Sequence, residues 1–395
     1  MQKKSHFNKY RRHHSKRKML LVLIMTIAII GILGIVIYHH LSSSNELTTP
    51  NQITITDSFP KNYNVAPSND PQAMQFDMLT SRQSQKVARW LKADRFIGTA
   101  LIVKNGKPIF KHSYGYADFA QHRLNKPNDL YQLASVQKTI TGVLIMQEID
   151  AGKLAMNDHI DQFYPSIPHG NQITIRMMLN MTSGIICNHL PNKMMSTQGF
   201  LNYYLTHLHV SHIGTWNYQP VNYNLLTGIL EKITGQSYQN LVTERIIKPL
   251  HLHETGFVFN WEKLPTYTQG YALTDLAHPY QRPIYETNYE KACQIGTGNM
   301  YSSANDLYIL QRDIIEGKII SKKKLAILRD GHFNSQYAGG IYTYKDHFMS
   351  HGLIAGFEAT IVISRNGQDA VVMLSNRNAD HYAPATATRI FEMIK

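Results

Sequence analysis

The sequence predicts a mixed fold, in which helices surround one antiparallel β-sheet and a single transmembrane helix precedes the folded body. Three observations carry this prediction: strand-like runs near both ends of the body, helical segments broken by Pro and Gly at about 152–290, and an uncharged apolar run near the N-terminus. Strands at both ends of the body with helices between them favour one sheet with an inserted helical region.

The first 18 residues form a basic tail. They contain eight Lys or Arg and no Asp or Glu, while the whole chain of 395 residues has a net charge of +13. Subtracting these eight charges leaves +5 for the rest of the chain, where no basic cluster typical of nucleic-acid binding stands out. The sequence therefore predicts no nucleic-acid partner.

A transmembrane helix is predicted at residues 19–38. These 20 residues carry no charge, and at about 1.5 Å per residue they span the ~30 Å hydrocarbon core of a bilayer. The preceding basic tail keeps 1–18 in the cytoplasm and exports the body. A cleaved signal peptide is the alternative, but the run exceeds the ~7–15 apolar residues of such peptides and no Ala-x-Ala site follows. We expect a single-pass cell-membrane protein with an extracytoplasmic body.

Residues 39–75 are rich in Ser, Thr, Asn and Pro, which is typical of a flexible stalk. The hydrolase body is expected at 76–395, with its helical subdomain at about 152–290. Hydrophobic periodicity and β-branched runs predict its elements. In chain order these are a helix (83–91), a hairpin of two strands (98–103 and 108–114), a long helix (135–151), two further strands (359–364 and 370–374) and a closing helix (385–395).

Ser135 and Lys138 are the candidate catalytic pair. The spacing Ser-x-x-Lys also occurs at Ser15, Ser58 and Ser321, but only Ser135 begins a long apolar helix. At a helix start, free N–H groups and the helix dipole stabilise developing negative charge. Lys138 follows at i+3 on the same face, and desolvation would let its neutral form accept the Ser135 proton. On this tetrapeptide alone, a capping serine with an exposed lysine stays an alternative.

Seven ordered segments extend the case beyond this tetrapeptide. They are FIGTALIVKNGKPIFKHSYGYAD (96–118), YQLASVQKTITGVLIMQEIDAGKLAMNDHIDQFYP (131–165), ITIRMMLNMTSGI (173–185), YNLLTGILEKITGQSY (223–238), KPLHLHETGF (248–257), GTGNMYSSANDL (296–307) and GLIAGF (352–357). Together they resemble the class C β-lactamase and penicillin-binding-protein-like serine hydrolases. The resemblance implies a β-lactamase/transpeptidase-like fold, an α/β part plus an all-α part, with the site in the cleft between them.

The family's second motif, Tyr-x-Asn, corresponds to Tyr218-Gln219-Pro220. By this resemblance Tyr218 is the third catalytic residue and carries the proton from Ser135 to the leaving group. Pro220 replaces the family's Asn, so the motif is half present. A structural tyrosine in the core is the alternative for Tyr218.

The family's third motif, Lys-Thr-Gly or His-x-Gly, corresponds to Ser350-His351-Gly352, three residues expected to contact substrate. Ser350 stands where the family usually has a cation. The N–H groups of Leu353 and Ser135 are expected to form the oxyanion hole. His351 points into the cleft or packs at the strand end, and the sequence leaves both open.

These departures bear on the substrate. A carboxypeptidase that cleaves D-Ala-D-Ala must hold a terminal carboxylate, which calls for a strong cationic donor at the third motif. A D-alanyl ester of a polyol-phosphate polymer has no such carboxylate. The chain is most similar in motif pattern to teichoic acid D-alanyl esterases. We therefore expect D-alanylated lipoteichoic acid as the substrate. Cleavage of the peptidoglycan stem by a DD-carboxypeptidase, other esterase or amidase chemistry, and a non-catalytic β-lactam or cell-wall sensor are the alternatives.

No metal or cofactor is expected. His207, His209 and His212 lie close in sequence, but no Asp or Glu accompanies them at ligand spacing, and the family needs no metal. Cys187 and Cys293 lack the spacing of a zinc or redox site, and packing as small core residues is favoured over a disulfide.

Overall fold

The computed structural model describes residues 75–272, 278–331, 336–377 and 382–395. The predicted tail (1–18), anchor (19–38) and stalk up to residue 74 lie outside these ranges. Within the described ranges, no helix is both long enough and apolar enough to span a bilayer.

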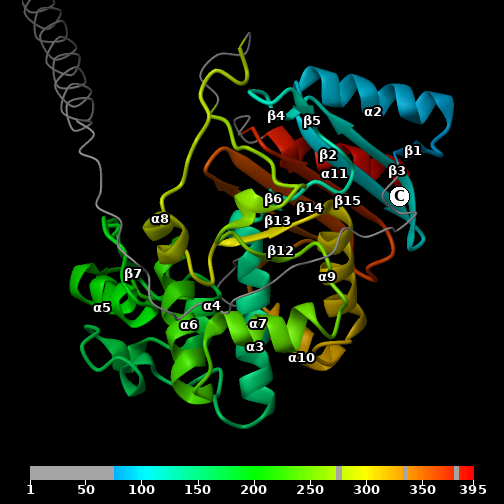
Figure 1. Ribbon diagram of the computed structural model, residues 1–395. Coiled ribbons are helices and arrows are strands. Elements are labelled where there is room, and N and C mark those ends of the chain that lie inside the picture. Colours follow the sequence, from blue (N-terminus) through cyan, green and yellow to red (C-terminus); the bar gives the residue numbers. More distant parts are fainter. Residues whose placement is uncertain (1–74, 273–277, 332–335, 378–381) are drawn as a thin grey trace, which may run out of the picture. The chain divides into compact units, whose positions relative to one another are not determined.

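An antiparallel sheet of eight strands forms the centre of the body (Figure 1). Strands from both ends of the chain lie side by side in it, as the sequence predicts. The strands, in spatial order, are β1 (Phe76–Asp77), β3 (Lys107–Tyr114), β2 (Gly98–Lys104), β15 (Ala370–Ser375), β14 (Phe357–Ser364), β13 (His347–Ile354), β12 (Ile341–Thr343) and β11 (Tyr337–Ala338).

The sheet separates two apolar cores, because successive side chains of a strand point to opposite faces. On β14, Ala359 and Ile361 belong to the larger core, which the sheet shares with the inserted helices. Val362 belongs to the smaller core, under the helices α2 (Ser81–Ala93) and α11 (Tyr382–Ile394). Figure 1 shows these two helices on one side of the sheet and the helical part on the other. Both helices were predicted.

The helical part gathers around α3 (Lys138–Asp150), which is buried for most of its length. Its buried residues lie on all sides of the helix and include polar ones such as Lys138 and Thr141, so α3 packs inside the domain rather than on its surface. Of the other helices, α6 (Val221–Thr234), α7 (Tyr238–Val242) and α10 (Lys322–Leu328) pack against α3. The remaining helices and turns are η3 (Ile160–Gln162), η4 (Gly170–Gln172), α4 (Ile175–Leu179), α5 (Thr197–His207), η5 (Thr243–Ile247), η6 (Trp261–Lys263), α8 (Asn288–Cys293) and α9 (Ala304–Glu316).

Short strands also occur outside the main sheet. They form one three-stranded and two two-stranded sheets: β6 (Tyr131–Gln132), β10 (Met300–Ser302) and β9 (Gly256–Phe257); β4 (Tyr116–Asp118) and β5 (Arg123–Leu124); β7 (Ile185–Ile186) and β8 (His209–Val210).

Two features differ from the periodicity-based expectation. The helix expected over 135–151 begins with a 3-10 turn, η2 (Ala134–Gln137), and becomes α-helical at Lys138. Four strands of the main sheet, β1, β11, β12 and β13, were not predicted from periodicity. Cys187 and Cys293 are both free thiols, and no disulfide joins them, in line with the favoured interpretation.

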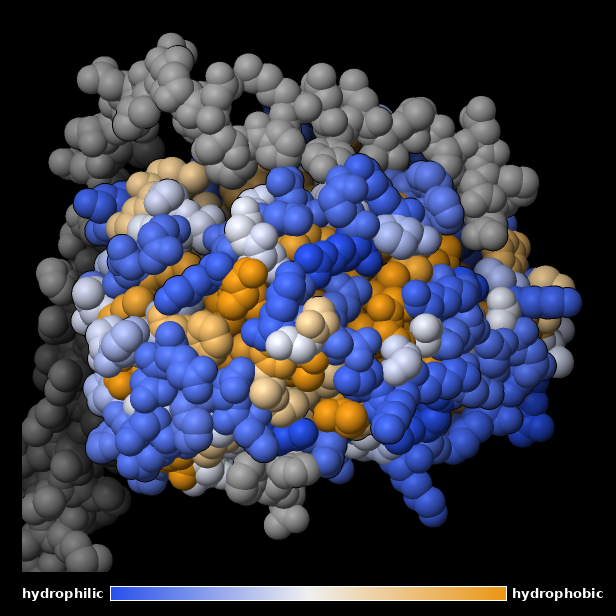
Figure 2. Space-filling view, turned by 90° about the horizontal axis from the view of Figure 1, so that it is seen from below, coloured by the Kyte–Doolittle hydropathy of each residue, from blue (hydrophilic) through white to orange (hydrophobic). Residues whose placement is uncertain are grey.

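Seen from below, hydrophobic residues on the surface lie in patches broken by hydrophilic ones (Figure 2), which is ordinary for a protein surface.

Candidate active site

Ser135 lies on the 3-10 turn η2, immediately before α3. It is partly exposed, while its neighbours on both sides in the chain are buried. The preceding residue, Ala134, has φ 47°, a left-handed conformation that costs a non-glycine residue about 1–3 kcal/mol and persists only where packing enforces it. This turn presents the Ser135 hydroxyl at the surface of an otherwise closed core.

Lys138 contacts Ser135 directly, as the i+3 spacing predicts. Its Nζ donates to Ser135 Oγ over 2.9 Å and to the Thr297 carbonyl oxygen over 3.3 Å. The residue is only 1% exposed, so the alternative of an exposed lysine beside a capping serine does not describe this site. Thr297 belongs to the Gly-Thr-Gly-Asn segment, whose role in holding the lysine was not predicted.

Tyr218 lies beside this pair. The Lys138 Nζ is 5.2 Å from the centre of the Tyr218 ring, and the ring packs edge-on against Tyr337 at 5.6 Å. Pro220 is the N-cap of α6, with φ −54° and ψ −32°, so its ring suits the start of a helix. The half-preserved motif thus keeps its tyrosine at the site while proline begins the next helix.

The strand β13 runs past the nucleophile at very short range. A Cβ atom on Gly352 would lie 2.5 Å from the Ser135 nitrogen and 2.6 Å from the Leu133 carbonyl oxygen. Only glycine fits there. At the start of α3, a Cβ on Gly340 would lie 2.4 Å from the Lys138 carbonyl carbon, so a second glycine lets the sheet contact the catalytic helix.

Ser350 and His351 face opposite sides of the sheet. Ser350 pairs with Ile361 and His351 with Thr360, and paired residues share a face. Since Ile361 belongs to the core shared with α3, Ser350 faces the catalytic helix. The His351 Nε2 instead lies 3.0 Å from Glu358 Oε1, a carboxylate whose side chain is 1% exposed. The structure therefore shows the His351 ring packed against Glu358, although the residue also contributes to the lining of the pocket over Ser135.

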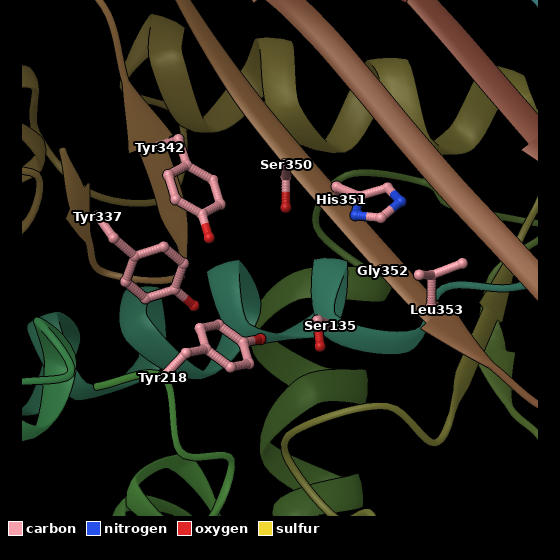
Figure 3. Close-up of a pocket in the computed structure, with 9 residues that line it drawn as sticks. Ser135, Tyr218, Tyr337, Tyr342, Ser350, His351, Gly352 and Leu353 are labelled. Atoms are coloured by element: carbon pink, nitrogen blue, oxygen red, sulfur yellow. The ribbon is translucent and has the colours of Figure 1, made fainter. Parts of the chain in front are cut away.

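A pocket of about 280 Å³ opens over Ser135 (Figure 3). Most of the predicted site residues meet there, with Lys138 beneath. Three lining residues, Tyr337, Gly340 and Tyr342, were not predicted. They belong to one stretch rich in Tyr and Gly, residues 337–342, and this composition was a signal in the sequence. The lining residues are Ser135, Tyr218, Tyr337, Gly340, Tyr342, Ser350, His351, Gly352 and Leu353.

The pocket wall is aromatic and uncharged on the side of Tyr218. Tyr337 packs edge-on against Tyr342 with ring centres 5.0 Å apart. Burial raises the pKa of Tyr342 to about 12, and burial together with the nearby Tyr218 raises the pKa of Tyr337 well above 10. A phenol with an ordinary pKa near 10 already keeps its proton at neutral pH, and burial only disfavours its loss further, so this wall carries no negative charge.

Other histidine clusters lie apart from this pocket's lining. His207 stacks on Tyr203 and bonds to its carbonyl oxygen, and His212 bonds to Ser211 Oγ. Within the described ranges, ligand atoms of Asp346, His347 and Glu392 come within 4.8 Å of one another, but the Lys395 ammonium pairs with both of these carboxylates.

Comparison with known proteins agrees with this geometry. A family model described as Beta-lactamase matches residues 84–393. The putative penicillin-binding protein PbpX of Bacillus subtilis (strain 168) is 26% identical over 386 residues, covering 97% of this chain and 96% of PbpX. The teichoic acid D-alanine hydrolase of Staphylococcus aureus is 26% identical over 246 residues, covering 60% of this chain and 59% of that protein. The crystal structure of FmtA from Staphylococcus aureus matches the fold with a TM-score of 0.72 at 22% identity, covering 81% of this chain and 90% of FmtA. The chain therefore belongs to the beta-lactamase family of serine hydrolases and has its β-lactamase/transpeptidase-like α/β fold.

Proposed function

We propose that this protein is a membrane-anchored, extracytoplasmic serine esterase that hydrolyses D-alanyl esters of (lipo)teichoic acid. Ser135, Lys138 and Tyr218 are its catalytic residues. One observation carries the proposal: among the described residues that line the pocket there is no Lys or Arg, although Ser135 and Lys138 are 2.9 Å apart.

The reaction begins when Lys138 accepts the proton of Ser135 and Ser135 Oγ attacks the ester carbonyl. The N–H groups of Ser135 and Leu353 stabilise the oxyanion. β13 pairs with β12 only at Met349 and Phe348, so its later residues have one edge without a strand partner among the described strands, which supports a role for Leu353. Tyr218 passes the proton to the leaving alcohol oxygen. Water then attacks the D-alanyl ester on Ser135 and releases D-alanine.

The missing cation distinguishes this substrate from a peptide terminus. A terminal carboxylate is best held by Arg or Lys through charge-assisted hydrogen bonds. Ser350 is neutral, and the His351 ring is engaged by Glu358. A D-alanyl ester needs no such donor, and the hydrolase named for teichoic acid D-alanine is among the relatives.

In this proposal residues 19–38 anchor the protein in the membrane and residues 1–18 lie in the cytoplasm. Residues 39–75 form a stalk that carries the hydrolase body, residues 76–395, outside the cell. The basic tail and the uncharged apolar run support this arrangement. Lipoteichoic acid chains begin at that membrane surface. An anchored hydrolase body would therefore lie at the same membrane surface as its substrate.

The test uses the full-length protein in detergent with D-alanylated lipoteichoic acid. We expect release of free D-alanine, lost in Ser135→Ala. The same protein is incubated with a pentapeptide stem and with a fluorescent penicillin. Cleavage of the stem but not of the polymer would instead identify a DD-carboxypeptidase. Stable labelling by the drug without D-alanine release would indicate a sensor.

A further inference from the structure

Two arginines contact one phenylalanine ring outside the pocket lining. The Arg329 Cζ lies 3.9 Å from the centre of the Phe348 ring, and the Arg365 Cζ lies 4.3 Å from it. Phe348 is packed in the larger apolar core, and the face of an aromatic ring attracts cations. The ring therefore holds the two guanidinium groups close together. We refer to Arg329, Arg365 and Phe348 as the arginine cluster.

Neither guanidinium has an acidic partner within the described ranges. Arg329 makes no side-chain hydrogen bond or ion pair there, and its Nη1 is a buried donor without an acceptor. Arg365 is exposed, and its Nη1 donates to the Tyr344 carbonyl oxygen over 3.3 Å. Asp346, whose carbonyl oxygen accepts from the Arg365 N–H, directs its carboxylate to Lys395 instead. No described carboxylate therefore neutralises the charge of the arginine cluster.

The buried arginine keeps its charge. Arg329 is 7% exposed, and a buried cation without an acidic partner costs free energy. Burial, and after it the like charge of Arg365, lowers the pKa of Arg329 to about 9, so the group is still charged at neutral pH. Guanidinium groups bind phosphate oxygens through pairs of charge-assisted hydrogen bonds. The arginine cluster thus has the chemistry of a phosphate site.

The strand β13 relates the arginine cluster to the nucleophile. Phe348 and Ser350 are two residues apart on this strand, so their side chains project to the same face of the sheet. Phe348 precedes Gly352, which contacts the Ser135 nitrogen, by four residues, or about 13 Å of strand. At this distance the arginine cluster cannot touch a D-alanyl group on Ser135, but a polymer chain that leaves the pocket can reach it.

The turn between β11 and β12 lies between the pocket and the arginine cluster. Gly340 lines the pocket. A Cβ atom on the adjacent Gly339 would lie 3.0 Å from the Leu328 carbonyl oxygen, and Arg329 follows Leu328 in the chain. Only this short turn therefore separates the pocket wall from the start of the arginine cluster.

We propose that Arg329 and Arg365 bind a phosphodiester of the substrate polymer, away from the ester that reacts at Ser135. This inference rests on the proposed function, because a polyol-phosphate polymer carries a negative charge in every repeat. The pocket itself has no Lys or Arg in its lining, so the arginine cluster supplies the attraction for the polyanion. A small D-alanyl ester has no phosphate and gains nothing from it.

The first experiment compares a polymeric substrate with a small one on the full-length protein in detergent. The variant Arg365→Gln removes the exposed charge but keeps a side chain that can form hydrogen bonds. We expect its KM for D-alanylated lipoteichoic acid to rise about tenfold, the effect of losing one charge-assisted hydrogen bond. Its kcat for the polymer and its kcat/KM for D-alanine methyl ester should stay at the wild-type values.

The matched control is Arg89→Gln. Arg89 is also exposed and also donates to a backbone carbonyl oxygen, that of Gln85, at 3.3 Å, but it belongs to α2 on the other side of the sheet (Figure 1). A second variant, Arg329→Met, removes the buried cation. It is assessed by the ratio of kcat/KM for the polymer to kcat/KM for the methyl ester. This ratio is independent of the fraction of active enzyme, so partial unfolding does not imitate the effect.

A second experiment separates the sources of phosphate. Calorimetry measures the binding of poly(glycerol phosphate) free of lipid and of D-alanine, of inorganic phosphate, and of a short-chain phosphatidylglycerol, all at the same phosphorus concentration. We expect the polymer to bind more tightly than the other two, and its Kd to rise about tenfold in Arg365→Gln.

The outcomes separate the two proposals. If Arg365→Gln and Arg329→Met both keep the wild-type ratio, or if Arg89→Gln lowers it equally, the phosphodiester site is wrong while the esterase proposal stands. If inorganic phosphate or the lipid binds as tightly as the polymer, the assignment to the polymer is wrong. If neither the polymer nor the methyl ester releases D-alanine, the proposed function fails, and calorimetry still decides whether the arginine cluster binds the polymer.

Discussion

The Lys138 Nζ lies 2.9 Å from Ser135 Oγ and 3.3 Å from the Thr297 carbonyl oxygen. The lysine is 1% exposed, so neutral acceptors hold it in a pocket that water barely reaches. Burying an ammonium costs free energy unless it is well paired. A side chain placed this way next to a nucleophile is arranged to take a proton rather than to stabilise the fold.

Replacing this lysine therefore should remove most of the activity. Lys138→Met keeps the length and apolar stem but cannot accept a proton, and we expect kcat/KM for D-alanyl esters to fall by about 10²–10⁴-fold. Lys324→Met is a matched control, since Lys324 also follows a serine at i+3 but pairs with Asp150 at 2.8 Å. Equal losses in the two variants would contradict a special role for Lys138.

The close approach of β13 to the nucleophile gives a second prediction. In Gly352→Ala the new Cβ would meet the Ser135 nitrogen at 2.5 Å, so the strand or the turn must move. Small displacements of reacting groups cost about 10²-fold in rate, and we expect a loss of this size in kcat/KM.

The control for this variant is Gly235→Ala at the end of α6. Gly235 has φ 68°, and a Cβ atom added to it would have no neighbouring atom within 4 Å. It should lose about 1 kcal/mol of stability and keep its kcat/KM. Wild-type activity in Gly352→Ala would show that the strand does not fix the site's geometry.

A buried carboxyl group predicts a pH dependence of stability. Burial raises the pKa of Asp306 from 3.8 to about 7 in the folded protein. The folded state therefore binds this proton more tightly than the unfolded state. Its contribution to stability is full below about pH 4 and is lost as the pH rises toward 7.

The variant Asp306→Asn isolates this effect, because Asn cannot ionise and its carbonyl oxygen can still accept from the Glu254 N–H and the Thr255 hydroxyl, which contact Asp306 at 2.7 and 3.0 Å. The free energy of unfolding, measured with urea at several pH values, should rise in the variant relative to wild type between pH 4 and 7. A constant difference over this range would contradict the raised pKa.

The sequence predicted the strands whose residues are nearly all apolar or β-branched. β2, β14 and β15 are buried along almost their whole length, so composition alone marks them. β13 mixes His, Ser and Gly with apolar residues, and its pairing with β14 over eight residues holds it in the sheet. This hairpin pairing with a buried neighbouring strand outweighs the weak intrinsic strand preference of the residues in β13.

The site residues also fall into those that the sequence could predict and those that it could not. Ser135 and Lys138 meet because they lie three positions apart on one helical turn, and a contact at this spacing can be predicted from the sequence. Tyr218 and Ser350 were found only through the family's motifs. Tyr337 and Tyr342 were not predicted because they lie on β11 and β12, strands of two and three residues, which are too short for a period-2 pattern to show.

The neutral residue at the start of the third motif gives the most direct test of substrate choice. Ser350→Lys places an ammonium where the family usually has a cation, so it should improve binding of a carboxylate-ended D-Ala-D-Ala peptide through a charge-assisted hydrogen bond. We expect the ratio of kcat/KM for this peptide to kcat/KM for a D-alanyl ester to rise about tenfold, since such a bond contributes about 1.5–3 kcal/mol. Ser350→Met adds a similar length without charge and should not raise the ratio. If both variants change the ratio equally, bulk rather than charge governs the selection, and the missing cation does not explain the preference for an ester.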